Sequence, residues 1–462
     1  MAVARRRSRT ARSLIFCAPA AFLVATACAP TGDDAITIQS TPGSTQSTPV
    51  ETATLEVLVN TTPDEPSHDS LHVLPSEASK VANVPGSAIT TTSSTSTTFS
   101  TVSITAQTPS TSTAPFDAAS VSFAFSGDIL PHSPLWRGAQ RIAAANGRSG
   151  YDFSPMLGGL AALHASVDVA ICHLETPIAP VGEELSTVPY YGVPAEVVDA
   201  IADAGFDRCS TASNHVFDRG SAGIDRTVGE FERVGVAQTG MARTPNEIEP
   251  TTFAVNGVQL AHLSYTFSYN GLRLPLGEDW RSRLIDVGRI IADATSARVL
   301  GAEAVIVSLH WGAEKVTAPT VEQRAIAEAL TASGQVDLIV GHHAHVVQPI
   351  EQINGVWVVF GLGNVLSNLP ASDEFPVNSQ DAMVVTIDMQ RDPYGLITWG
   401  RPIVYPTWVD KADEWTVLLL DEELARNDIA PGRRSVLEAS LRRTLNVVGP
   451  YAVSGGWAVS GG

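Results

Sequence analysis

Six apolar, strand-like runs, each followed at once by polar side chains, most constrain what this chain can fold into. Helical stretches alternate with the runs, and this alternation is typical of an α/β domain. In open α/β sheets the ligand crevice lies beyond the carboxyl ends of the strands. The polar residues are therefore expected to converge. The runs are 121–126, 167–172, 206–212, 304–309, 336–340 and 356–360, and the polar residues after them are Asp128, His173, Glu175, Asn214, His215, His310, His342, His343, His345 and Asn364.

The stretches between the runs carry helix signals. Three of them end within two residues of a glycine, the residue that most often caps a helix C-terminus. Beyond residue 370 the pattern changes to two strands and a long helix. The predicted helices are 194–204, 220–233, 320–333 and 421–445, and the late strands are 382–389 and 396–409.

Composition divides the chain before the first run. Between Ser87 and Pro115, 19 of 29 residues are Ser or Thr. Such a segment has too little apolar surface to offset its ordering entropy, so residues 29–115 are predicted to be a disordered linker. It would act as a stalk that holds the domain away from the membrane. The alternative is a linker that only connects the two parts of the chain. An ordered domain is predicted over residues 116–450, with a flexible tail at 451–462.

The first 28 residues have the features of an export signal. They hold five arginines and no acid, followed by an apolar run of 14 residues, Leu14 to Ala27. That run is shorter than the roughly 20 residues of a membrane span. The small residues before Cys28 resemble a bacterial lipobox, which predicts a lipidated Cys28. Ordinary cleavage near Ala27 or Ala29 is the alternative. In both cases the protein is exported, either to the outer face of the membrane as a lipoprotein or into the medium.

Charge narrows the classes of partner. The chain has 29 basic and 48 acidic residues and a formal net charge of −19. Nucleic acid and anionic lipid surfaces are bound through basic patches, so no nucleic-acid partner is expected. An anionic substrate stays possible where local cations supply positive charge.

Two cysteines remain after the predicted signal. Cys172 and Cys209 both lie in apolar, strand-like runs. Two buried thiols are the preferred interpretation, and a disulfide is the alternative in an oxidising compartment.

The polar residues at the strand ends suit metal chemistry. Carboxylates, neutral imidazoles and an amide oxygen are ligands for Mn, Fe or Zn. No cysteine stands at a strand end, so thiolate ligation is not expected. One carboxylate can bridge two ions about 4 Å apart and so help to activate water. A further histidine can protonate the leaving group. Two divalent transition metal ions are therefore predicted.

Six short motifs occur in the order seen in the CapA family, the bacterial capsule-synthesis or poly-γ-glutamate-biosynthesis family related to calcineurin-like metallophosphatases. The resemblance covers about residues 120 to 370 and implies a four-layer α/β/β/α sandwich with two mixed sheets packed face to face. The motifs are Phe125-Ser126-Gly127-Asp128, Leu174-Glu175-Thr176-Pro177, Asn214 to Gly220, His310-Trp311-Gly312-Ala313-Glu314, His342 to Gln348 and Leu362-Gly363-Asn364.

The resemblance also implies roles for individual residues. Glu175 occupies the place of the bridging carboxylate. His215 lies near the reacting group and, with the ligand Asn214, forms the catalytic pair. The implied metal ligands are Asp128, Glu175, Asn214, His310, His343 and His345.

Three positions depart from the family pattern. Leu130 stands where metallophosphatases have histidine, which leaves the first metal site short of one ligand, and Pro131 can turn the nearby His132 away. His173 stands where Asn is usual and could compensate, although a surface or supporting histidine is the preferred interpretation. Ser213 replaces a common Asn.

The leading functional hypothesis is an exported protein of capsule or poly-γ-glutamate biosynthesis, export or anchoring, with a dinuclear hydrolase-type metal site. One alternative is a metallophosphoesterase acting on envelope or nucleotide substrates. Another is a non-catalytic scaffold that binds polymer. The expected partners are an extracellular anionic polymer or phosphoester, a membrane-bound polymer synthase complex, and the membrane through the lipid anchor.

Overall fold

The computed structural model describes residues 116–449 and 452–453. The predicted signal peptide, the linker at 29–115 and the tail, apart from Ala452–Val453, lie outside the described residues. Within the described part of the chain, no helix is both long and apolar enough to cross a bilayer.

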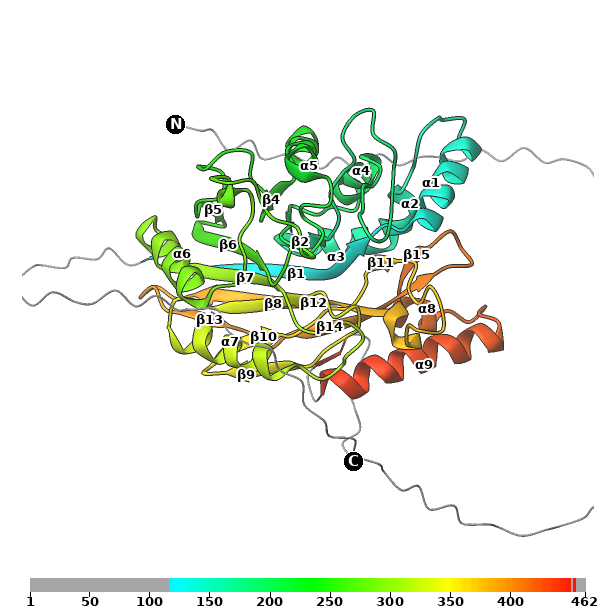
Figure 1. Cartoon of the computed structure of the whole chain (residues 1–462). Helices are drawn as coiled ribbons and strands as arrows, with labels where there is room; N and C mark the ends of the chain where they lie inside the picture. Colours follow the sequence, from blue (N-terminus) through cyan, green and yellow to red (C-terminus); the bar gives the residue numbers. More distant parts are fainter. Residues whose placement is uncertain (1–115, 450–451, 454–462) are drawn as a thin grey trace, which may run out of the picture. The chain divides into compact units, whose positions relative to one another are not determined.

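Two mixed β-sheets form the centre of the domain (Figure 1). The first follows the order β15-β14-β12-β1-β2-β3-β4, with β11 on β1, β13 on β12 and β16 on β14; the second follows β5-β6-β7-β8-β10-β9. The strands of the first sheet are β1 (Ala119–Leu130), β2 (Val169–Leu174), β3 (Arg208–Ser210), β4 (Ala237–Thr239), β11 (Leu366–Ser367), β12 (Asp381–Arg391), β13 (Ile397–Trp399), β14 (Ile403–Asp410), β15 (Thr416–Leu419) and β16 (Ala452–Val453). Those of the second are β5 (Thr252–Val255), β6 (Val258–Thr266), β7 (Ala304–His310), β8 (Leu338–His342), β9 (Ile350–Ile353) and β10 (Val356–Val359).

Helices cover the outer faces of both sheets (Figure 1). Helices α1 to α5 lie over the first sheet, and α6 and α7 pack on the second. Their bounds are α1 (Ser133–Ala145), α2 (Ser154–Leu157), α3 (Ala161–Ala165), α4 (Glu196–Asp203), α5 (Gly220–Val234), α6 (Val287–Val299), α7 (Val321–Ala332), α8 (Leu420–Ala425) and α9 (Pro431–Val448), with short 3-10 turns at Gly158–Leu160, Asp279–Arg281 and Val377–Gln380.

Alternation along the strands explains the layers. In β1, Phe123 and Phe125 face the second sheet, whereas Ala124 faces the helices. Successive strand residues point to opposite faces, so a strand buried on both sides reads as a continuous apolar run. Separate apolar clusters fill the space between the sheets and the space under each helical layer. The predicted four-layer α/β/β/α sandwich is confirmed.

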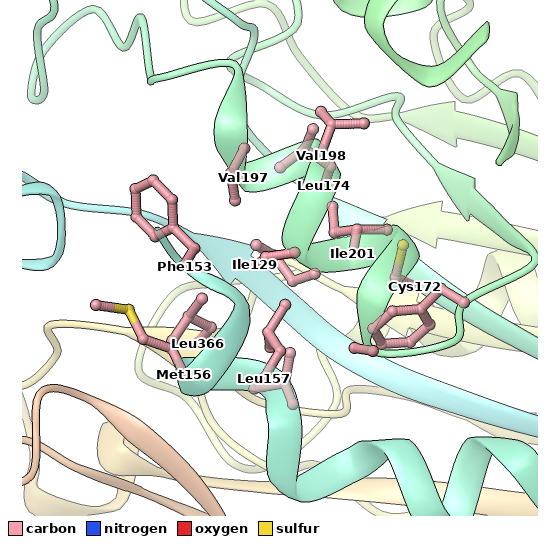
Figure 2. Close-up of a cluster of buried hydrophobic side chains, with 14 of the residues drawn as sticks. Ile129, Phe153, Met156, Leu157, Cys172, Leu174, Val197, Val198, Ile201 and Leu366 are labelled. Atoms are coloured by element: carbon pink, nitrogen blue, oxygen red, sulfur yellow. The ribbon is translucent and has the colours of Figure 1, made fainter. Parts of the chain in front are cut away.

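The cluster beneath the first helical layer also contains a cysteine (Figure 2). Ile129, Phe153, Leu157, Ile201 and Cys172 all belong to this cluster. Cys172 lies opposite Cys209 on the neighbouring parallel strand, and the two form a disulfide. The preferred interpretation of two free thiols is therefore wrong, and the alternative is correct. The bond ties β2 to β3 directly before the polar ends of both strands.

Three elements differ from their predicted form. The late strand predicted at 396–409 is two strands, β13 and β14, which pair with successive parts of β12. Strand β1 continues through Asp128 to Leu130, because a bulge between Phe125 and Asp128 shifts its register against β2 and lets the strand carry on. The predicted helix 421–445 is two helices, since Pro431 starts α9 at a position where its missing N–H costs nothing.

Candidate metal centre

All six predicted ligands gather in one buried cluster where strands of both sheets end. The His345 Nε2 to Glu175 Oε1 distance is 3.6 Å, and that from His345 Nδ1 to Asp128 Oδ2 is also 3.6 Å. His310 Nε2 lies 3.9 Å from Glu175 Oε1 and 2.9 Å from Asn214 Oδ1. The sixth, His343, packs its ring 4.7 Å from that of His310. The convergence expected from the strand ends is therefore found.

Close backbone packing and unusual dihedrals form this edge. A side chain on Gly127 would lie 2.1 Å from the Gly363 carbonyl, so only glycine lets Asp128 approach the second sheet's loops. After β8, His343 and His345 have φ values of 86° and 55°, the left-handed region that non-glycine residues seldom occupy. Strained residues of this kind concentrate at functional sites.

Glu175 is the least satisfied polar group of the cluster. Its side chain is 0% exposed, and neither carboxylate oxygen has a hydrogen-bond partner among the described residues. Burial raises the pKa of Glu175 well above its usual value, and the carboxylates of Asp128, Glu314 and Asp218 add to that effect. A buried carboxylate without donors is costly unless a cation neutralises it.

Asp128 is held differently. His342 Nδ1 donates to Oδ1 at 2.9 Å and the His343 amide donates to Oδ2 at 3.1 Å. Burial alone would raise the pKa of Asp128, but the His342 hydrogen bond and the surrounding imidazoles outweigh it and lower the pKa. Asp128 is therefore an ionised carboxylate, the form that binds metal.

Three imidazoles of the cluster are held in the neutral form by their lowered pKa values. Burial, followed by the nearby His345, lowers the pKa of His343 to about 3. Burial and neighbouring imidazoles also hold the pKa values of His173 and His310 well below the usual value. A neutral imidazole keeps one nitrogen lone pair free, as metal ligation requires.

Two sets of three side chains could each hold a metal ion. Within each set, the three ligand atoms lie within 4.8 Å of one another. Because both sets combine a carboxylate with imidazoles, and neither Glu175 oxygen accepts a hydrogen bond from the described residues, these residues fit divalent transition metals. One set is Asp128, His173 and His342, and the other is Glu175, His343 and His345.

His215 lies beside the cluster rather than in it. Its Nδ1 donates to Asp218 Oδ2 at 2.7 Å, and its ring meets the edge of Tyr191 with 4.6 Å between centroids. His215 lines a cavity of about 350 Å³ together with Asn214 and His345. The cavity therefore brings His215 next to the candidate ligands.

The structure adds residues to which the sequence assigned no role. Asp218 orients His215, and its spacing of three residues was the available signal. Asn364 accepts from His345 Nδ1 at 2.9 Å. The surface interpretation of His173 is wrong, because the residue is 1% exposed and lies inside the cluster. His132 faces the cavity but belongs to neither ligand set.

Comparison with known proteins identifies a family model and several relatives that match this chain. The family model described as bacterial capsule synthesis protein PGA_cap matches residues 122–369, more than half of the chain. The PGA biosynthesis protein CapA of Bacillus subtilis is 29% identical over 202 residues, which cover 43% of this chain and 51% of that protein. The capsule biosynthesis protein CapA of Bacillus anthracis is 30% identical over 173 residues, covering 37% of this chain and 42% of that protein. The match thus spans about half the length of these relatives.

Solved structures give weaker likenesses. The NAD nucleotidase NadN of Haemophilus influenzae is 14% identical with a TM-score of 0.40, covering 74% of this chain and 65% of that one. The calcineurin-like phosphoesterase YfkN of Bacillus subtilis is 11% identical with a TM-score of 0.38, covering 71% of this chain and 97% of that one.

Proposed function

Because the chain belongs to the bacterial capsule synthesis protein PGA_cap family, we propose that it helps to make, export or anchor an acidic extracellular polymer, with a dinuclear, metal-dependent hydrolase-type site. The polymer would be a capsule polysaccharide or a polyglutamate. A membrane-bound polymer synthase complex is the proposed assembly partner. The alternative substrate is a phosphoester of the envelope or of a nucleotide.

The observation that carries the proposal is the state of Glu175. This carboxylate is fully buried, accepts no hydrogen bond from the part of the chain that the structure describes, and faces His310 and His345 at 3.9 and 3.6 Å. A structural role would leave the carboxylate uncompensated. A ligand shared between two cations removes that cost, and this supports a pair of ions over a purely structural cluster.

The ligand residues of the proposal are those predicted from sequence, Asp128, Glu175, Asn214, His310, His343 and His345. Bound divalent ions would polarise the scissile bond and activate water. The protein's own contribution is a rigid, largely buried frame, in which Asn364 fixes His345 through a hydrogen bond from Nδ1. That bond leaves His345 Nε2 facing Glu175.

His215 is the proposed general acid. Asp218 accepts a hydrogen bond from His215 Nδ1. The Tyr191 amide also donates to Asp218, at 2.7 Å, and this second hydrogen bond restrains the carboxylate. The ring is thereby oriented so that Nε2 is the nitrogen available to the substrate. In this arrangement His215 donates a proton to the departing oxygen or nitrogen.

The proposed location is the outer face of the cell membrane. Its support is the sequence alone: an arginine-rich start, a short apolar run, Cys28 and a Ser/Thr-rich linker. Cys28→Ser should shift the protein from the membrane fraction to the medium. Unchanged partitioning, with no lipid on the mature N-terminus, would contradict a lipid anchor.

Metal analysis combined with a substrate panel tests the function. The full-length protein, purified under metal-replete conditions, should bind about two transition metal ions per chain. It should then cleave a γ-glutamyl polymer or a phosphodiester, and the preferred substrate separates the polymer role from the phosphoesterase alternative. Absence of bound metal would sink the hydrolase proposal and favour a scaffold. His164→Asn is a matched control, since His164 is buried outside the cluster.

A further inference from the structure

Each ring nitrogen of His310 faces a possible hydrogen-bond acceptor, but the neutral ring has only one N–H to donate. Its Nε2 lies 2.9 Å from Asn214 Oδ1, and its Nδ1 lies 3.0 Å from His173 Nε2. A neutral imidazole carries one N–H, so it can donate to only one of two neighbours. The identity of that neighbour decides which nitrogen of His310 is free to bind a cation.

The proton positions on His173 can be traced outward. Ser210 Oγ donates to the Cys172 carbonyl at 3.4 Å, which leaves its lone pairs free to accept. His173 Nδ1 lies 2.8 Å from Ser210 Oγ, and with the hydroxyl proton directed to the Cys172 carbonyl, Nδ1 is the donor of this pair. The neutral His173 ring therefore has no proton on Nε2, and this lone pair points at His310 Nδ1.

We propose that His173 is a positioning residue that accepts the Nδ1 proton of His310 and so fixes the tautomer in which His310 Nε2 is a metal ligand. The inference rests on the metal site proposed above. With Nδ1 protonated, His310 Nε2 presents its lone pair to the side where Asn214 Oδ1 and Glu175 Oε1 converge. Hydrogen bonds to the outer nitrogen of a ligating histidine orient the ring and raise its basicity.

Strand pairing keeps this relay in place. His173 lies opposite Ser210 in the β2–β3 register, one position beyond the disulfide-bonded pair Cys172 and Cys209. In addition, the His173 ring stacks on the His342 ring, with centroids 4.1 Å apart and an angle of 17° between the ring planes. The relay His310–His173–Ser210 therefore has little freedom to rotate away.

The competing arrangement makes His173 itself a ligand, since its ring also lies within the set formed with Asp128 and His342. The two arrangements predict different responses to substitution. A positioning residue can be replaced by another hydrogen-bond acceptor of similar reach, whereas a lost imidazole ligand removes an ion.

Binding of Mn²⁺ alone, measured on the full-length protein by calorimetry and metal analysis, separates them. We expect His173→Ala to keep the wild-type number of ions but to weaken one site by about 10- to 100-fold. His173→Gln, whose Oε1 can accept from His310 Nδ1, should recover most of that affinity. Ser210→Ala should lose less than His173→Ala. Thermal unfolding of each variant, beside His164→Asn, shows that the fold is retained.

Three outcomes would overturn the inference. Loss of a whole ion in both His173→Ala and His173→Gln would make His173 a ligand. Unchanged Mn²⁺ affinity in His173→Ala would deny it any role at the site while leaving the proposed function intact. Wild-type protein that binds no Mn²⁺, Zn²⁺ or Fe²⁺ would remove the proposed function and this inference together.

Discussion

Two buried carboxylates in this domain have opposite surroundings. Asp381, on β12, is 1% exposed and accepts hydrogen bonds of 2.6 Å from Ser440 Oγ and from Nε and NH2 of Arg443 on α9. Glu175, after β2, is 0% exposed and accepts none within the described residues. Burial raises the pKa of both carboxyls. At Asp381 the hydrogen bonds from Arg443 and Ser440 and the charge of Arg443 oppose part of that rise.

The difference separates a structural charge from a functional one. Asp381 has its counter-ion built into the chain, and the pair fastens α9 to the first sheet. Glu175 instead faces the imidazoles of His310 and His345, so the described residues supply ligands but no guanidinium or ammonium counter-charge. A buried charge without compensation persists only where something outside the chain provides it.

Exchanging each carboxylate for its amide should give the largest and most contrasting effects. Glu175→Gln should lose both ions and all measurable turnover, yet stabilise the metal-free protein by about 1–3 kcal/mol, because an uncompensated charge disappears. Asp381→Asn should destabilise it by about 3–5 kcal/mol by breaking a buried pair, with the metal content unchanged. Metal analysis and denaturant unfolding measure both.

The comparison fails if the two substitutions act alike. Equal metal loss would mean that Asp381 supports the site through the fold, and equal destabilisation would mean that Glu175 has a partner inside the chain. Arg443→Ala offers a check, because it should reproduce the instability of Asp381→Asn without touching the cluster.

His215 provides the next largest effect. His215→Ala should lower turnover by about 10²- to 10⁴-fold while both ions stay bound, because the general acid is lost but no ligand is. Asp218→Asn should lower turnover in the same direction, since the ring loses the carboxylate that orients it. Turnover on the best substrate and metal stoichiometry are measured together, and loss of an ion in His215→Ala would reassign His215 as a ligand.

Local patterns were sufficient to predict an α/β domain and the convergence of its polar strand ends, whereas the four-layer sandwich was implied by the resemblance to the CapA family. Each strand and its polar end occupy only a few consecutive residues, and parallel strands bring such ends together by geometry. The bulge in β1 was not predictable in this way. It depends on how Gly127 packs against the Gly363 carbonyl, a residue more than 200 positions away in the chain.

The supporting residues of the site were harder to predict for the same reason. Ser210 acquires its role from His173 on another strand and carries no motif of its own. Asn364 stands in a motif, but its partner His345 lies on another segment, so the motif alone did not show the contact. The interpretation of His173 as a surface residue was wrong, because its burial depends on the second sheet, whereas the supporting role is the one proposed above. Asp218, three residues from His215, had a local signal for its contact.

A buried histidine away from the cluster should make its own contribution to acid sensitivity. His164 contacts the Ala204 carbonyl at 2.8 Å through Nδ1, and burial lowers its pKa from 6.5 to about 4. The unfolded chain takes up the proton first, so the stabilising contribution is complete above pH 6.5 and is lost as the pH falls toward 4. The loss is about 3 kcal/mol. His164→Asn, which keeps a donor to Ala204 but does not titrate there, should remove that part of the pH dependence in unfolding measurements. If wild type and His164→Asn lose stability identically as the pH falls, the role of His164 in acid sensitivity is contradicted.

Reduction of the disulfide should give the smallest effect and test how the site depends on the strands beneath it. Cys172 and Cys209 join β2 to β3 one residue before His173 and Ser210. Strand hydrogen bonds and the apolar cluster around both cysteines remain after reduction, so the relay should loosen without coming apart. We expect Mn²⁺ affinity to fall by no more than about 10-fold, less than in His173→Ala. Cys172→Ala with Cys209→Ala should behave like the reduced protein, which separates loss of the bond from other actions of the reductant. A fall larger than that of His173→Ala would show that the disulfide holds more of the site than the relay alone.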